Sequence, residues 1–161
     1  MNVLAVTGHV DPSSEPFVRA EFASLLAALA VDDPLDGWCC IAEGVGSIFA
    51  EELLAAGGRL HIVMPSEDYR ETTVEPGHAE TFDRLVASAV EVVTLPHATV
   101  SREAYGDANR LLLERASGLV AVWDGERSSE KGDAGDMVTQ AEAAWRGVFR
   151  IWPGRPWGTP V

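Results

Sequence analysis

Residues 38–65 constrain the fold more than any other segment, because they predict a strand, a glycine turn, a helix and a second strand in succession. Residues 38–42 form a short apolar run, and Gly44 and Gly46 follow it at once. Apolar side chains then recur at helical spacing, at Ile48, Phe49, Leu53 and Ala56. A pair of glycines ends this helix before the next apolar run. The segment therefore predicts one βαβ unit.

The turn in this unit, Glu43-Gly44-Val45-Gly46-Ser47, gathers backbone N–H groups at the positive end of a helix, which favours an anionic ligand such as a nucleotide phosphate. It has neither the three-glycine dinucleotide fingerprint nor the lysine of a P-loop, so it is also compatible with an ordinary strand-to-helix turn. Glu43 either accepts hydrogen bonds from ribose hydroxyls or caps the helix. We take Glu43, Gly44, Gly46 and Ser47 as candidate ligand contacts.

The same alternation of strands and helices continues along the chain. Further strands are predicted at residues 2–6, 59–65, 91–95, 119–123 and 148–152, and further helices at 15–30, 79–89, 101–116 and 136–145. Apolar strands without alternation indicate a parallel sheet that is covered on both faces. We expect an α/β fold: a single Rossmann-like, doubly wound, mainly parallel sheet over residues 1–152, with an extended Pro/Trp tail at 153–161.

Composition excludes several classes of function. The chain of 161 residues carries 25 acidic and 12 basic side chains, a net charge of −13, so we expect no nucleic-acid partner. Without an apolar run near 18 residues or a signal peptide, we expect a cytoplasmic protein with no membrane contact. Cys39 and Cys40 are adjacent in a strand and point to opposite faces, so they predict packing roles. The histidines lack metal-ligand spacing, and we predict neither a metal nor a cofactor.

In a doubly wound sheet, ligands bind at the carboxyl ends of the strands. Gly8 and His9 follow the first strand, and Pro65 ends the strand after the βαβ helix. A second glycine-rich helix start follows the strand at 119–123; its candidate ligand contacts are Asp124, Gly125, Gly132 and Asp136. Together with the turn at Gly44 and Gly46, it predicts a two-sided phosphate cradle.

Other polar and aromatic residues near these strand ends have two interpretations each. Arg19 either reaches back to a phosphate or is a solvated helix residue, and His9 is either a donor or acid–base group or a turn residue. Tyr69 fits stacking on a base and Arg70 fits pairing with phosphate, whereas both also fit a solvated loop.

These segments together resemble the SLOG superfamily, the Rossmann-like proteins related to LOG phosphoribohydrolases and to the DNA-processing protein fold. The likeness extends to about residue 152. It is based on four segments: Thr7-Gly8-His9, residues 42–51, Val63-Met64-Pro65 with Asp68-Tyr69-Arg70, and residues 121–125 with the glycine-rich helix start. The resemblance implies a nucleotide or nucleotide-derived ligand held by these loops, in a homodimer or higher homo-oligomer.

The chain departs from LOG enzymes and nucleoside deoxyribosyltransferases at the catalytic glutamate. Alignment of the glycine-rich loops places Met137 or Thr139 where those enzymes have it. We therefore expect a binding module, a sensor or carrier for a nucleotide-like molecule. The alternative is an N-glycosidic hydrolase of nucleoside monophosphates in which Glu43, the tentative catalytic residue, or Asp136 supplies the carboxylate. A third possibility is a protein whose nucleotide site has decayed and which acts through oligomer contacts.

Overall fold

The sheet of the computed structural model has six strands, all parallel, in the order β4-β3-β2-β1-β5-β6. The structure describes residues 3–41, 44–123, 134–144 and 147–152. The strands are β1 Val3–Gly8, β2 Asp36–Cys39, β3 Arg59–Met64, β4 Glu91–Thr94, β5 Gly118–Val122 and β6 Gly147–Ile151. This order confirms the predicted Rossmann-like α/β fold, and it makes β1 the strand at which the chain changes direction across the sheet.

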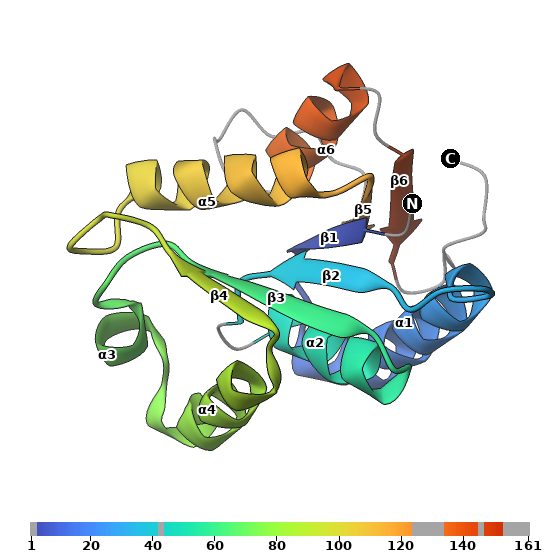
Figure 1. Cartoon of the computed structure of the whole chain (residues 1–161), viewed down its shortest axis with the longest axis horizontal. Helices are drawn as coiled ribbons and strands as arrows, with labels where there is room; N and C mark the ends of the chain where they lie inside the picture. The colour runs from blue at the N-terminus through green and yellow to red at the C-terminus, as the bar shows by residue number, and fades with distance from the viewer. Residues whose placement is uncertain (1–2, 42–43, 124–133, 145–146, 153–161) are drawn as a thin grey trace.

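Helices cover both faces of the sheet (Figure 1). On one face lie α1 Glu15–Leu29, α2 Val45–Ala55, α3 Tyr69–Thr73 and α4 Ala79–Ser88, with the 3-10 turns Pro12–Ser14 (η1) and Pro76–His78 (η2) before α1 and α4. On the other face lie α5 Arg102–Arg115 and α6 Ala134–Ala143. In the described residues, no helix is long and apolar enough to cross a membrane.

One apolar core lies on each face of the sheet, and successive residues of a strand point alternately into one core and the other. In β5, Val120 and Val122 pack with α1 and α2, whereas Leu119 and Ala121 pack with α5 and α6. This alternation explains why the strands are apolar throughout, because both of their faces are buried. Cys39 joins the first core and Cys40 packs against the second, so their opposite orientations are confirmed.

The predicted boundaries differ from the observed ones by up to three residues. The largest shift is in β2, predicted at residues 38–42 and observed at Asp36–Cys39. It starts early because Asp36 pairs with Val3 of β1 and Arg59 of β3, although Asp36 and Gly37 have low strand propensity. Similarly, α6 begins at Ala134 rather than at Asp136. Tertiary pairing has overridden local preference in β2.

A polar cluster joins three strands at the amino-terminal edge of the sheet, opposite the expected ligand edge. Arg59 of β3 donates two hydrogen bonds of 2.8 Å to the carboxylate of Asp36. The His61 ring lies between two carboxylates, with Nε2 2.9 Å from Asp36 Oδ1 and Nδ1 3.0 Å from Glu91 Oε1. Chiefly through the hydrogen bonds from Arg59, this cluster lowers the pKa of Asp36 to about 2.

The lowered pKa predicts a pH-dependent effect of Asp36→Asn. Because the folded state holds the ionised form, the stabilisation is fully present above pH 4 and is lost as the pH falls toward 2. At pH 7 we expect the variant to lose roughly 1 kcal/mol, a value reduced for solvent screening of the half-exposed Arg59. Urea unfolding at pH 7, 4 and 2 would show this difference closing. The matched control, Asp32→Asn at an exposed position, should show no such trend.

Candidate functional site

A pocket of about 140 Å³ lies at the carboxyl end of β1, where the strand order changes direction. Its walls come from the end of β1, the segment after β2, the first residues of α2 and the inner side of α5. The described lining residues are Val6, Thr7, Gly8, Cys40, Val45, Gly46, Tyr105, Asn109 and Leu112. Of the predicted ligand contacts, Gly8 and Gly46 are therefore brought together here.

Gly8 and Gly46 are required by contacts within the chain itself. Gly8 has a φ of +126°, and a Cβ there would collide with the carbonyl oxygen of Val122 in the neighbouring strand β5. A Cβ on Gly46 would collide with the carbonyl oxygen of Cys40. The sequence predicts both glycines as ligand contacts, whereas the group that approaches each one closely is the protein's own backbone. Close packing of α2 against the end of β2 explains Gly46.

Gly44 is the glycine that leaves space beside the pocket. Its φ is +118°, a conformation that L-residues rarely adopt, and a Cβ on it would meet no described atom within 4 Å. Its carbonyl accepts the first helical bond of α2, from the N–H of Ile48 at 3.1 Å. The N–H groups of the next residues, Val45 and Gly46, belong to the first turn of the helix, whose donors have no intrahelical partner. The positive end of α2 thus borders the pocket.

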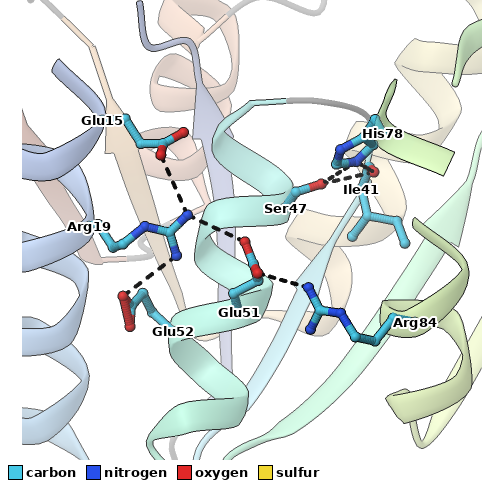
Figure 2. Close-up of polar contacts among 8 residues, drawn as sticks. All are labelled: Glu15, Arg19, Ile41, Ser47, Glu51, Glu52, His78 and Arg84. Carbon is cyan, nitrogen blue, oxygen red and sulfur yellow. Dashed lines mark hydrogen bonds and ion pairs between the residues drawn. The ribbon is translucent and has the colours of Figure 1, made fainter. Parts of the chain in front are cut away.

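The hydroxyl of Ser47 lies in a buried polar cluster rather than in the pocket lining. Ser47 Oγ donates to the carbonyl oxygen of Ile41 at 2.9 Å and lies 2.9 Å from Nε2 of His78 (Figure 2). His78 Nε2 is also 3.1 Å from the same carbonyl oxygen. All three contacts are satisfied when Nε2 carries the proton, because the Ser47 hydrogen is already donated to Ile41. Through these contacts, the cluster holds Ile41, the residue before the turn, against η2.

Arg19 is surrounded by carboxylates between helices. Its guanidinium lies 3.3 Å from Glu51, 3.7 Å from Glu52 and 3.7 Å from Glu15. Glu51 also accepts a hydrogen bond of 2.9 Å from Arg84 of α4, so one carboxylate connects α1, α2 and α4 (Figure 2). The structure thus places Arg19 in an interhelical ion-pair network, outside the described lining of the pocket.

Tyr69 and Arg70 also lie apart from the described lining. The Tyr69 side chain is 2% exposed and packs in the core, with ring centroids 6.4 Å from Phe82 and 6.5 Å from Tyr105. Arg70 makes a two-point ion pair with Asp83 of α4, at 2.8 and 2.7 Å. These hydrogen bonds lower the pKa of Asp83. Tyr69 is connected to the pocket only through its contact with Tyr105, which forms part of the pocket wall.

His9 and Pro65 occupy strand ends, as predicted, but do not line the pocket. The His9 N–H donates to the carbonyl oxygen of Val122 at 3.3 Å, and its ring meets the edge of Trp152 at 5.6 Å between centroids. Pro65 is buried at the end of β3. Glu43, Asp124, Gly125 and Gly132 lie outside the described residues, as does the tail at 153–161, and Asp136 is described only as part of the backbone of α6.

Sequence reasoning missed the wall formed by Tyr105, Asn109 and Leu112. A signal was available, because a helix that follows a parallel strand begins at the carboxyl edge of the sheet, where ligands bind. Tyr105 and Asn109 are four residues apart within the first eight residues of α5, so they share one face of the part of the helix that starts at that edge. The sequence gives no signal for the buried contacts of His78, because its partners Ser47 and Ile41 are more than 30 residues away.

The described lining of the pocket is electrically neutral at pH 7. It contains no Asp, Glu, Lys, Arg or His, and burial raises the pKa of the Cys40 thiol to about 12. Cys40 therefore contributes a protonated, weakly polar wall and not a nucleophile. In the described parts of the chain, no group of three His, Cys, Asp or Glu side chains is arranged to hold a metal ion.

Solved structures with a similar fold support the architecture described above. No protein-family model and no curated protein matches the chain. Among solved structures, the chain is similar to the protein TM1055, with 18% identity and a TM-score of 0.58 over 92% of this chain and 72% of that one. It is also similar to the molybdenum cofactor carrier protein MCP from Chlamydomonas reinhardtii, with 13% identity and a TM-score of 0.57 over 92% and 75%. These similarities support the Rossmann-like fold.

Proposed function

We propose that this protein binds a nucleotide or nucleotide-derived small molecule at the carboxyl edge of its sheet and acts as a sensor, carrier or binding module. The observation that carries the proposal is the pocket at the end of β1, bordered by the first residues of α2. Both features favour the same class of ligand: the switch point of an α/β sheet is where ligands bind, and a helix start attracts a phosphate.

Two further observations support binding over catalysis. The described wall contains neither a carboxylate nor a histidine, and an N-glycosidic hydrolase would need such a group beside the scissile bond. In addition, one of the solved structures with this fold is a molybdenum cofactor carrier protein, a protein named for holding a small molecule. The protein as purified should therefore retain or take up such a molecule. Native mass spectrometry would detect it and would also test the expected homo-oligomer.

A calorimetric titration tests the proposal directly. We expect nucleoside 5′-monophosphates to bind the wild-type protein and expect Thr7→Phe to weaken that binding at least tenfold, because the larger side chain fills a pocket of about 140 Å³. Thr94→Phe is the matched control: Thr94 also ends a strand of the sheet but is exposed and outside the described pocket lining. It should bind like the wild type.

Two results would count against the proposal. Equal weakening by Thr7→Phe and Thr94→Phe would indicate that the ligand binds elsewhere. Absence of binding at millimolar nucleotide concentrations would favour a protein that does not bind nucleotides. Chromatography of each mixture after incubation measures release of the free base. Sustained release by the wild type would establish the hydrolase instead, and loss of that release in Glu43→Gln would assign Glu43 as its carboxylate.

A further inference from the structure

The α5 side of the pocket differs chemically from the side formed by α2. Tyr105, Asn109 and Leu112 lie along one face of α5, opposite the end of β1. We propose that the pocket holds the planar nitrogen heterocycle of the bound nucleotide and that Asn109 determines which heterocycle is accepted. This inference rests on the proposed function, since it divides the same site into a part for the ring and a part for the phosphate.

The size of the pocket supports a ring as its occupant. Pockets that enclose a whole drug-sized ligand measure about 300 Å³ or more, whereas a cavity of about 150 Å³ accommodates benzene. The pocket between β1 and α5 measures about 140 Å³. It therefore fits one planar ring of a nucleotide, and the sugar and phosphate must lie outside it.

The chemistry of the walls also favours a neutral ring over a phosphate. Val6, Val45 and Leu112 supply apolar surface, and the described lining offers no cationic side chain to pair with an anion. Transfer of an unpaired charge into such surroundings is costly, whereas an uncharged heterocycle gains from burial of its faces. Asn109 lines the pocket, and its side chain is an amide, a group that carries donor and acceptor atoms of the same kinds as the edge of a nucleobase.

The glycines support the same division of the site. Gly8 and Gly46 line the pocket, but each is explained by a backbone carbonyl of the protein, from Val122 and Cys40 respectively. Neither glycine therefore indicates that a phosphate enters the pocket. Gly44, by contrast, leaves open space among the described atoms at the start of α2. A phosphate placed there meets the positive end of the helix while the ring occupies the adjacent pocket.

The wall of α5 is held in place by the core. The ring of Tyr105 contacts that of Tyr69 edge to face, with centroids 6.5 Å apart and planes inclined at 72°, and Tyr69 is almost fully buried. Because Tyr105 and Asn109 are one helical turn apart, this contact fixes the side of the helix that presents Asn109. The amide is therefore carried by a rigid element, as selection by hydrogen bonding requires.

Calorimetry with four probes tests the assignment: the 5′-monophosphates of uridine, cytidine and adenosine, and ribose 5-phosphate, which lacks the base. We expect Asn109→Leu to weaken the preferred nucleotide about tenfold, the effect of losing roughly one hydrogen bond. Ribose 5-phosphate should bind this variant within twofold of the wild type. Arg110→Gln, an exposed change at the adjacent position of α5, should leave all four affinities unchanged.

A second variant distinguishes selection of the heterocycle by Asn109 from a purely structural role of this residue. Asn109→Asp keeps the size of the side chain but replaces the amide by a group that only accepts hydrogen bonds when ionised. The ratio of cytidine to uridine monophosphate affinity should rise, because cytosine presents an amino donor where uracil presents a carbonyl acceptor. An unchanged ratio, or equal losses for ribose 5-phosphate and the nucleotides in Asn109→Leu, would overturn the assignment. If the wild type binds none of the four probes, the proposed function fails and the assignment fails with it.

Discussion

Gly8→Ala is expected to destabilise the protein by about 3 kcal/mol, the sum of a backbone penalty and a steric one. The φ of +126° is unfavourable for any L-residue, and the added Cβ would collide with the carbonyl oxygen of Val122. That carbonyl cannot move freely, since it belongs to the hydrogen-bonded ladder of β1 and β5 and also accepts from the N–H of His9. Because Gly8 also lines the pocket, nucleotide affinity should fall together with stability.

Urea unfolding at pH 7 measures the loss, with Gly106→Ala as the matched control. Gly106 lies within α5, has an ordinary φ, and a Cβ on it would meet no described atom within 4 Å. Alanine is favoured over glycine inside a helix by up to about 1 kcal/mol, so the control should be slightly more stable than the wild type. A Gly8→Ala variant as stable as the wild type would show that β1 and β5 separate at this end more easily than the structure implies.

The outline of the fold was predictable because each strand and helix has its own local pattern. The glycines after residue 42 and the apolar spacing from Ile48 to Ala56 are consequences of local backbone and packing requirements, which a sequence contains. The function of each glycine was less predictable. Gly8 and Gly44 both precede a helix, but only the structure shows that a Cβ on Gly8 would meet a neighbouring carbonyl, whereas one on Gly44 would meet none of the described atoms within 4 Å.

The side-chain partners at the site depended on the three-dimensional arrangement. The chain has 25 acidic side chains against 12 basic ones, so an arginine near a helix has a high chance of meeting a carboxylate of its own protein. The described contacts of Arg19 and Arg70 follow this pattern, through Glu51 of α2 and Asp83 of α4. Sequence identifies a cation that suits a phosphate, but it does not show which carboxylates the folded chain places beside it.

The buried contact between His78 and Ser47 leads to the second large effect, a loss of about 2 kcal/mol in His78→Ala. The substitution removes one partner from the carbonyl of Ile41 and one from the hydroxyl of Ser47, in a region with little access to water. His97→Ala is the matched control, since His97 is also bonded through Nε2, to Asp107 at 2.8 Å, but is part-exposed. Its loss should stay below about 1 kcal/mol.

The contacts of His78 lie at the turn that begins α2, next to the pocket. Ile41 precedes the turn and Ser47 follows it, so loss of His78 releases η2 from both ends of the turn that begins α2. Amide hydrogen exchange at Ile48, whose N–H donates to the carbonyl oxygen of Gly44 in the first helical bond of α2, should accelerate in His78→Ala and stay near the wild-type rate in His97→Ala. His78→Gln, which can place an N–H donor near the position of Nε2, should restore much of the protection. Unchanged exchange in His78→Ala would show that Ser47 and the packing of Gly46 against Cys40 hold the turn without His78.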